Sequence, residues 1–302
     1  MINCLNIVQL VLFWFGNLYT EYMYLSIDIG GTHIRFATSG DGKKISQKEK
    51  FHTPAKYDDG IDLIEETIER MTNGHIPKKI TLGAASPINY EKGTIMKPPA
   101  LPNWAGHSIR KELELRLRTH IILENDASLA GLAEAHTSKK KQSEVVAYIT
   151  LSTGVGGSRI VNGKIDYHAT PFEPGHQILD PKGRFWPGCG QRGCFESMAS
   201  GRAFEITYGV KPELCEDFKI WEEHAQVVSQ GLVNVLTLWS PDVLVLGGSL
   251  VKAGKKFIDP LMHFTINNLQ IFPAPKIEIS KLDDNNVLLG GFILQQQKDP
   301  NL

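Results

Sequence analysis

Cysteine is scarce in this sequence, and neither sign of charge dominates it. Four cysteines in 302 residues are too few for a disulfide scaffold, and they fit a protein of the reducing cytoplasm. The 32 lysines and arginines nearly balance the 33 acidic residues. Because nucleic-acid-binding proteins usually carry clustered basic residues, we expect no nucleic-acid partner.

A hydrophobic run long enough to cross a membrane is missing near the N-terminus. Leu5–Phe15 is apolar apart from two amides, but a span needs roughly 20 residues. A signal peptide begins with a positive region, whereas the first basic side chain here is Arg35. We therefore interpret residues 1–22 as a leader from a misplaced start and expect no membrane partner. A weak membrane anchor and a genuine extra helix are the alternatives.

The remaining chain alternates strand-like and helix-like segments, which favours an α/β fold. "YLSIDIGGTHIRFATSGDGK" opens the first half and "VVAYITLSTGVGGSRIVNGKI" opens the second. Each has a glycine-rich turn between two strands and another turn about ten residues later. The repetition predicts a duplicated α/β unit with a cleft between its copies. Helices are expected over 60–71, 107–118, 225–239, 255–269 and 287–297.

The expected domain boundaries follow from this repetition. Residues 23–126 form the small N-terminal domain, which the C-terminal helix over 287–298 completes. Residues 127–286 form the large C-terminal domain.

The two glycine-rich turns are candidate phosphate sites. Glycine lets the backbone approach a ligand closely, and successive N–H groups can form an anion nest. A single Gly-Gly turn is more simply a tight hairpin, and neither turn has the Gly-Lys-Ser/Thr of a Walker loop. Their repetition at equivalent places favours phosphate binding. The nest residues are Gly30, Gly31 and Thr32 in the first half and Thr153, Gly154, Gly156 and Gly157 in the second.

Two further strand ends carry candidate ligand residues. Asp28 precedes the first turn, where a carboxylate can hold Mg²⁺ through water. Gly247 and Gly248 end "DVLVLGG", and the base or ribose of a nucleotide could lie there against bare backbone. A plain strand-to-helix turn is the alternative at this third site.

"LENDASLAG" places Asn125 and Asp126 between an apolar strand and a small-residue helix. Neither residue type favours a strand, and an unpaired carboxylate is costly to bury. Asn-Asp is also an ordinary helix-capping pair. These residues alone leave both chemistry and capping open for Asp126.

Six segments together resemble the ROK family of sugar kinases and repressors, within the sugar kinase, Hsp70 and actin superfamily. They are "DIGGTHIRFA", "LENDASLAGLAEA", "STGVGGSRIVNGKI", "EPGH", "CGQRGCFE" and "VLGGSLV", in the family's order from about Tyr24 to about Leu294. The resemblance implies two RNase H-like domains of the actin/hexokinase type, closing over a sugar and ATP. It also implies transfer of the γ-phosphoryl group to a sugar hydroxyl, usually the 6-hydroxyl of a hexose.

The resemblance also assigns roles to individual residues. Asp126 matches the catalytic aspartate and Asn125 its sugar-binding neighbour, while Glu173, His176 and Glu196 match sugar-hydroxyl ligands. A carboxylate beside the attacking hydroxyl takes its proton, and phosphoryl transfer otherwise depends on positioning and charge stabilisation. In this family context we expect Asp126 to be the general base.

The family's zinc pattern is broken at Pro187, which stands where the first of three cysteines belongs. His176, Cys189 and Cys194 then offer three ligands, whereas structural zinc normally has four. A zinc site and plain buried thiols are both open. If zinc is present, it orders the loop that bears Glu196 and takes no part in the chemistry.

The loops near the sugar and the second turn depart from the family as well. Ala85-Ser86 stands where Pro-Gly is common, and Ala100 stands where an Asn is common. Ser86 and Asn103 could supply replacement hydrogen bonds to the sugar or could merely fill their loops. Ser152 and Ser158 replace glycines around the second turn.

The expected activity is ATP-dependent phosphorylation of a hexose, with glucose as the first candidate. Fructose, mannose, allose and the N-acetylhexosamines are open as substrates. A non-catalytic sugar or nucleotide sensor is the alternative. A family transcriptional regulator is disfavoured, because the 22 residues before Met23 lack basic character. ROK relatives are often homodimers, so we also expect self-association.

Overall fold

The computed structural model describes residues 23–77, 79–96, 101–137, 144–166 and 170–298. The expected leader and Ala100 lie outside these ranges. The chain divides into two compact units: unit 1 is Met1–Leu129 with Val287–Leu302, and unit 2 is Ala130–Asn286. Among the described residues, no helix combines the length and the apolar character that a membrane span requires.

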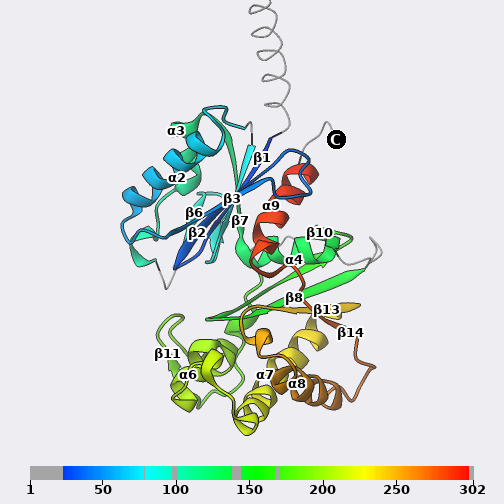
Figure 1. Ribbon diagram of the computed structural model, residues 1–302. Helices are drawn as coiled ribbons and strands as arrows, with labels where there is room; N and C mark the ends of the chain where they lie inside the picture. Colours follow the sequence, from blue (N-terminus) through cyan, green and yellow to red (C-terminus); the bar gives the residue numbers. More distant parts are fainter. Residues whose placement is uncertain (1–22, 78, 97–100, 138–143, 167–169, 299–302) are drawn as a thin grey trace, which may run out of the picture. The chain divides into compact units, whose positions relative to one another are not determined.

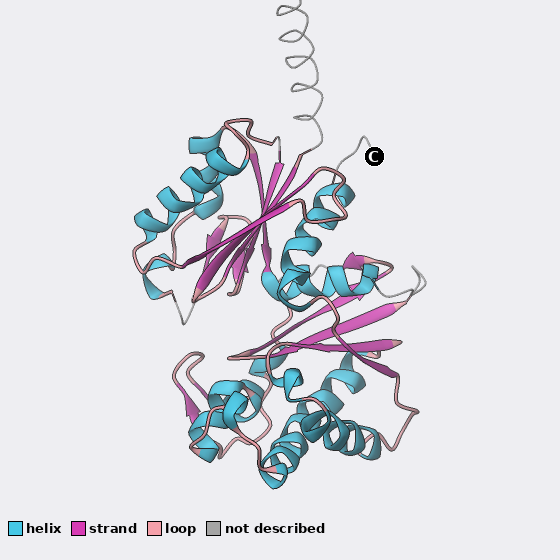
Figure 2. Ribbon diagram, in the orientation of Figure 1, coloured by secondary structure: helices cyan, strands magenta, loops and turns pink. Residues whose placement is uncertain are grey.

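Unit 1 is built on a five-stranded mixed sheet in the order β3-β2-β1-β4-β7 (Figures 1 and 2). Strands β1, β2 and β3 pair antiparallel, whereas β1, β4 and β7 run parallel. Every residue of β1 after Tyr24 is buried, as a strand covered on both faces requires. The strands are β1 Tyr24–Ile29, β2 His33–Ser39, β3 Gln47–His52, β4 Lys79–Ala84 and β7 His120–Asn125.

Helices α2 (Tyr57–Met71) and α3 (Ile109–Leu117) cover one face of this sheet, and α9 (Asn286–Gln297) covers the other (Figure 1). The buried stripe of α2 packs into the same core as β1 and β4. On the other face, Phe292 of α9 packs with Ala37 of β2. Segments from both ends of the chain therefore build unit 1.

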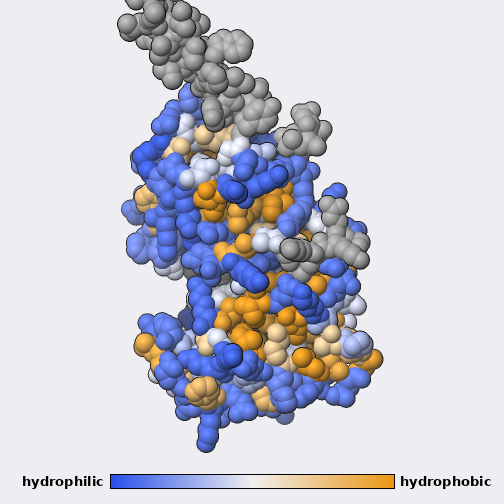
Figure 3. Space-filling view, turned by 45° about the vertical axis from the view of Figure 1, so that its right-hand side comes forward, coloured by the Kyte–Doolittle hydropathy of each residue, from blue (hydrophilic) through white to orange (hydrophobic). Residues whose placement is uncertain are grey.

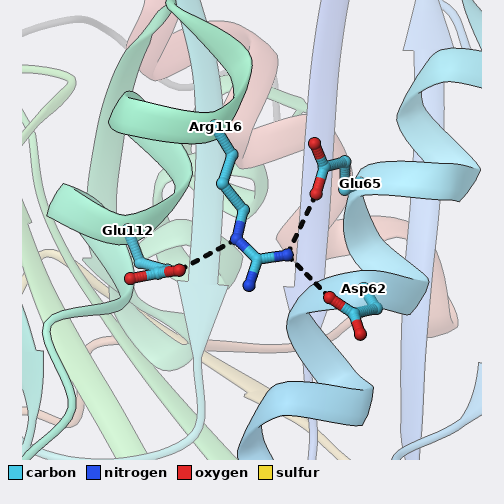
Figure 4. Close-up of polar contacts among 4 residues, drawn as sticks. All are labelled: Asp62, Glu65, Glu112 and Arg116. Carbon is cyan, nitrogen blue, oxygen red and sulfur yellow. Dashed lines mark hydrogen bonds and ion pairs between the residues drawn. The ribbon is translucent and has the colours of Figure 1, made fainter.

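An ion-pair network on the surface joins α2 to α3 (Figure 4). The Arg116 guanidinium lies 2.6 Å from Asp62, 3.0 Å from Glu65 and 2.8 Å from Glu112. These carboxylates raise the pKa of Arg116 above its usual range. Because the charges lie near solvent, the network contributes little to the free energy of unfolding.

Unit 2 repeats the sheet order, as β10-β9-β8-β13-β14. Strands β8, β9 and β10 pair antiparallel, and β8, β13 and β14 run parallel. Asn162 and Gly163, both with positive φ, form the tight turn between β9 and β10. The strands are β8 Val145–Leu151, β9 Val155–Val161, β10 Lys164–Ile165, β13 Val243–Gly247 and β14 Lys276–Ile279.

Helices α7 (Phe218–Trp239) and α8 (Lys255–Asn267) pack on one face of this second sheet (Figure 1). On the opposite face, α4 (Asp126–Thr137) packs closely, with Gly131 against Ser158 of β9. Ser158 thus contacts a helix, although the sequence placed it with the phosphate turn. Helix α7 begins well before the predicted residue 225, because the Asp217 side chain accepts the Lys219 N–H and caps it.

Short elements between β10 and α7 carry several residues of interest. They are η2 Pro174–His176, β11 Phe185–Trp186, β12 Gln191–Arg192, α5 Phe195–Ala199 and α6 Gly201–Tyr208. The two short strands pair as a hairpin with Trp186 opposite Gln191.

Some large apolar side chains of unit 2 are exposed, and Figure 3 shows apolar side chains among polar ones on the visible face. Leu238 is 79% exposed and Ile271 is 90% exposed. Scattered exposed apolar residues are normal in proteins, so the expected homodimer stays a prediction.

The predicted α/β fold with two duplicated domains is confirmed.

Candidate functional site

The carboxyl ends of three parallel strands meet at one edge of the unit 1 sheet. The register pairs Asp28 of β1 with Gly83 of β4, and Ala84 of β4 with Asn125 of β7. Asp28, the segment after Ala84 and the Asn125-Asp126 pair therefore gather at the same edge, where α/β sheets commonly bind ligands. We call this the unit 1 strand-end site.

Asn125, rather than Asp126, caps helix α4. The Asn125 Oδ1 accepts the N–H of Ser128 at 3.1 Å, which is the contact of a helix cap. Its amide nitrogen donates to the Ser86 carbonyl at 3.4 Å, and its own N–H donates to Glu124 Oε1 at 2.8 Å. Asn125 is therefore held from three directions, and it makes the N-cap contact of α4.

Asp126 is a half-buried carboxylate at the first position of α4. Its Oδ1 accepts the N–H of Ala127 at 2.7 Å. Desolvation raises the pKa of Asp126, while the Ala127 N–H and the charge of Arg35 oppose that rise. A carboxylate with a raised pKa is a stronger base than an exposed one, which suits proton abstraction from a hydroxyl.

Arg35 faces Asp28 across the β1–β2 pair. The two residues are direct partners in the strand register, and Arg35 Nη1 lies 3.1 Å from Asp28 Oδ2. Asp28 is buried, and the ion pair compensates its carboxylate for the loss of solvent. An oxygen donor of this kind fits Mg²⁺ held through water. Because Arg35 already engages one oxygen, the magnesium role stays a prediction.

The first glycine turn is tied to the end of β3. The Gly30 N–H donates to the His33 carbonyl at 3.0 Å, and the Thr53 hydroxyl donates to the Gly30 carbonyl at 2.7 Å. The Thr53 N–H donates to the Thr32 carbonyl at 3.0 Å. Because Gly30 uses its N–H within the turn, the predicted anion nest depends on Gly31 and the exposed Thr32.

The side chains of Ser86 and Asn103 hydrogen-bond to nearby backbone carbonyls rather than to residues of the unit 1 strand-end site. The Ser86 hydroxyl is buried and donates to the Pro87 carbonyl at 3.3 Å, so only its backbone contacts Asn125. Asn103 is exposed, and its amide donates to the Ala55 carbonyl at 3.2 Å. Both side chains have local partners that account for them, and their sugar contacts stay predictions.

In unit 2, the second glycine turn lies directly against Glu196. The Val155 N–H donates to Glu196 Oε2 at 3.0 Å, and a Cβ on Gly154 would lie only 2.6 Å from the same oxygen. The N–H of Val155, which lies between the predicted nest residues, is therefore not available to a phosphate. Thr153 and Gly154 lie in the turn, whereas Gly156 and Gly157 lie in strand β9, opposite Thr150 and Ile149 of β8. Phosphate binding by these four residues stays a prediction, and Thr153 is exposed as Thr32 is in unit 1.

The "EPGH" segment packs onto the same turn. Pro174 and Gly175 are buried, and Gly175 lies against the Val155 carbonyl. Glu173 precedes η2 and His176 ends it, both half-buried. Glu196 also contacts Val155, so the three predicted sugar ligands lie on segments that pack against the start of β9. This point lies at the sheet edge where β8 ends. We call the group the unit 2 strand-end site.

His176, Cys189 and Cys194 converge as the zinc pattern predicts. One ligand atom from each lies within 4.8 Å of the others, and the two sulfurs are 3.7 Å apart. His176 Nδ1 is buried without a hydrogen-bond partner among the described residues. Contact with the Cys194 thiol raises the pKa of His176, and the Glu196 charge adds to this against the effect of burial. This donor set fits zinc, with three of the usual four ligands.

The third glycine site is accounted for by close packing. Gly248 has φ +93°, and any side chain there would overlap the Leu151 backbone of the neighbouring strand β8. A Cβ on Gly247 would lie 2.5 Å from the Tyr148 hydroxyl. The Ser152 hydroxyl lies 3.2 Å from that of Ser249, so this turn and the second glycine turn meet at one sheet edge. Nucleotide binding by these glycines stays a prediction.

Three contacts were missed from the sequence. None of the sequence motifs assigned a role to Arg35, although a strand register counted across the first turn would have paired it with Asp28. The buried Glu124, whose Oε1 accepts the Tyr90 hydroxyl at 2.5 Å, precedes Asn125. The Trp186 indole donates to Glu196 at 2.8 Å, and only its position beside the altered Pro187 hinted at a role.

The chain matches known proteins over nearly its whole length. A glucokinase from Streptomyces coelicolor is 27% identical over 91% of this chain and 98% of its own. An N-acetyl-D-glucosamine kinase from Salmonella typhimurium is 29% identical over 90% of this chain and 99% of its own.

Solved structures give the same picture. The ROK hexokinase from Thermus thermophilus superposes with a TM-score of 0.80 at 28% identity, over 92% of this chain and 100% of that one. A ROK family glucokinase from Streptomyces griseus, in complex with glucose and AMPPNP, has a TM-score of 0.79. At 24% identity, over 91% of this chain and 99% of that one, this second likeness supports the fold alone. The model of the ROK family matches residues 24–298, and the chain therefore belongs to the ROK family.

Proposed function

We propose that this chain is an ATP-dependent hexose kinase that phosphorylates glucose. The observation that carries the proposal is the state of Asp126. Its carboxylate is half-buried, its pKa is raised, and Asn125 performs the capping that would otherwise explain it. A carboxylate of this kind at the end of a parallel strand suits a general base.

In the proposed reaction, Asp126 accepts the proton of the sugar hydroxyl. The hydroxyl oxygen forms a bond to the γ-phosphorus of ATP, the bond from that phosphorus to the bridging oxygen breaks, and ADP leaves. Arg35, paired with Asp28 and close enough to lower the pKa of Asp126, contributes positive charge near the reacting groups. Proton transfer to such a base typically accelerates a reaction by about 10²- to 10⁴-fold.

Sugar recognition is assigned to Asn125, Glu173, His176 and Glu196. Each sugar hydroxyl both donates and accepts, so a mixture of carboxylates, an amide and an imidazole can satisfy it. A site that pairs with these hydroxyls rejects analogues that lack them. Ser86 and Asn103 are kept as further candidates for sugar contacts.

The nucleotide is assigned to the glycine turns at Gly30–Thr32 and Thr153–Gly157, with Gly247 and Gly248 beside the base or ribose. Asp28 would hold magnesium through water, and the ion would neutralise phosphate charge when bound. His176, Cys189 and Cys194 would hold zinc, which would only order their loop. A cytoplasmic location and a homodimer also stay predictions.

N-acetylglucosamine is the second candidate substrate. The relatives named as N-acetyl-D-glucosamine kinases are as similar to this chain as those named glucokinase, at 29% and 27% identity. The departures at Ser86 and Pro187 fall near the proposed sugar residues, so identity at this level leaves both sugars as candidates.

A hexose panel tests the proposal. The purified chain is assayed for ADP release with MgATP and glucose, fructose, mannose, allose or N-acetylglucosamine, and zinc is measured on the same sample. We expect turnover with glucose above that with the other sugars. Turnover that is highest with N-acetylglucosamine would move the proposal to that substrate. Sugar binding without ADP release from any sugar would contradict a kinase and favour a sensor.

A further inference from the structure

We propose that Trp186 is a positioning residue that holds the Glu196 carboxylate in place for the sugar. The inference rests on the proposed function, because it takes Glu196 as a sugar ligand. Trp186 ends the short strand β11 and precedes Pro187, the residue that breaks the family's cysteine pattern.

Two donors hold the two oxygens of the Glu196 carboxylate. The Trp186 indole N–H donates to Oε1 at 2.8 Å, and the Val155 N–H donates to Oε2 at 3.0 Å. Hydrogen bonds to a charged acceptor are stronger than neutral ones. A carboxylate can accept about four such bonds, so each oxygen keeps capacity for a sugar hydroxyl. The two donors therefore fix the orientation of the Glu196 carboxylate and leave it able to accept hydrogen bonds from a sugar.

The Trp186 ring is itself firmly held. It is 5% exposed and packs with Cys194 and Ala203, and the Arg202 guanidinium lies 5.6 Å from its ring centroid. Its carbonyl accepts the Gly190 N–H at 2.8 Å, which closes the hairpin turn that starts at Pro187. A buried and packed indole loses little further entropy when it holds its acceptor.

The choice of acceptor separates Trp186 from the other fully buried tryptophans. The indole of Trp104 donates to the Pro54 carbonyl at 3.0 Å, and that of Trp221 donates to the Cys215 carbonyl at 3.0 Å. Those contacts satisfy a buried N–H with backbone, as a core indole requires. Trp186 instead donates to a half-buried ionisable side chain that also contacts the second glycine turn. Its hydrogen bond therefore links the hairpin to the proposed ligand.

The test replaces Trp186 with phenylalanine, which keeps an aromatic ring and removes the N–H. We expect Trp186→Phe to raise the KM for the best sugar by about tenfold, the size of one hydrogen bond to a charged group. The kcat and the KM for ATP should change by less than about twofold. Phe185→Leu, in the exposed neighbour on the same hairpin, is the matched control and should leave all three unchanged. A fall in kcat together with a rise in the KM values for both sugar and ATP would mean that the substitution disturbs the fold of unit 2 in general, and it would overturn the inference.

A double-mutant cycle shows whether Trp186 acts through Glu196. In a Glu196→Ala background, adding Trp186→Phe should change the sugar KM by less than about twofold, because the partner is already gone. A second tenfold loss on top of that of Glu196→Ala would overturn the inference.

One readout is independent of kinase activity. In ¹⁵N-indole NMR, the resonance that Trp186→Phe removes should shift in Glu196→Ala, whereas those of Trp104 and Trp221 should not. An unmoved Trp186 resonance would contradict the contact. If the wild-type chain phosphorylates no hexose, the proposed function fails, and this shift alone decides whether Trp186 holds Glu196.

Discussion

In unit 1 the ionisable side chains at the edge where β1, β4 and β7 end lie on the sheet strands or directly after them, whereas in unit 2 Glu173, His176 and Glu196 come from the η2 and α5 segments that pack against the start of β9. Asp28, Arg35 and Asp126 belong to the first edge, with an ion pair of 3.1 Å inside it. At the second edge, Glu196 is anchored by Val155 and Trp186. Both edges follow the same sheet order. The same sheet order thus carries its ionisable groups on the strands in one unit and on inserted segments in the other.

The glycine turns differ in the same sense. A Cβ on Gly30 would meet only the His33 carbonyl, at 3.1 Å. A Cβ on Gly157 would lie 2.6 Å from the Tyr148 carbonyl and 2.8 Å from Pro174. Gly157 lies within β9, opposite Ile149 of β8, so the strand that follows the unit 2 turn is more tightly packed than the unit 1 turn at Gly30. Substitutions at Asp126 and at the glycines test this difference directly, and those at His224 and Arg116 test the core of unit 2 and the surface of unit 1. The four predictions run from the largest expected effect to the smallest.

Asp126→Asn keeps the size of the side chain and removes the base. We expect kcat for the best sugar to fall by about 10²- to 10⁴-fold, because the hydroxyl proton loses its acceptor. Steady-state kinetics measure the change. Asp59→Asn, at an exposed position of α2, is the control and should leave kcat unaltered. Equal kcat values for the wild type and Asp126→Asn would show that Asp126 is not the general base.

His224 makes the stability of unit 2 sensitive to pH. It is 1% exposed among Phe204, Trp221 and Phe257, and burial lowers its pKa from 6.5 to about 4. Between pH 6.5 and about pH 4, His224 binds a proton in the unfolded chain but not in the folded chain. The stability that depends on neutral His224 is therefore complete above pH 6.5, decreases as pH falls, and is lost below pH 4.

Across that window the loss amounts to about 3 kcal/mol in the free energy of unfolding. Urea unfolding at a series of pH values measures it, and His224→Gln provides the comparison. The difference between the two proteins should shrink as pH falls. A difference that is constant with pH would mean that His224 titrates normally in the folded state.

Gly157→Ala and Gly30→Ala compare the first half of strand β9 with the unit 1 turn. We expect Gly157→Ala to lower the free energy of unfolding by about 2 kcal/mol, because the methyl group would press on backbone. Gly30→Ala should cost about 1 kcal/mol or less. Urea denaturation measures both. Equal losses would show that the unit 1 turn is packed as closely as strand β9 and would contradict the comparison.

Arg116→Gln removes the centre of the ion-pair network on unit 1. The Arg116 side chain is 30% exposed, so solvent screens its pairs with Asp62, Glu65 and Glu112. We expect a loss of about 1 kcal/mol or less, which should vanish in 1 M NaCl. Unfolding at low and high salt measures it. A larger loss that persists in high salt would contradict a screened surface network.

The fold could be predicted from the sequence because its signals are local. Apolar periodicity predicted α2 and α8 close to their observed bounds, and the Asn-Gly pair at 162–163 predicted the β9–β10 turn. The start of α7 was missed, although Phe218, Ile220 and Trp221 lie in its first turn and the Asp217 cap directly precedes them. The ROK resemblance is confirmed by the family match over residues 24–298.

The candidate site was harder to predict, because its contacts depend on register and packing. Asp126 was recognisable, but its motif could not show that Asn125 caps the helix in its place. Trp186 and Glu196 are brought together by a hairpin whose turn type was not recognised. The closeness of Glu196 to Val155 depends on two segments distant in the chain. Short motifs therefore identified the candidate ligands, while the residues that hold them in place became visible only in the structure.

Sugar binding by Asp126→Asn tests the central claim most directly, because it separates chemistry from holding. Isothermal titration of this variant and of the wild type with the best sugar would give the two dissociation constants. We predict that they differ by less than about threefold while turnover by the variant is lost. A variant whose sugar affinity falls as far as its kcat would contradict the account, because Asp126 would then be holding the sugar rather than activating it.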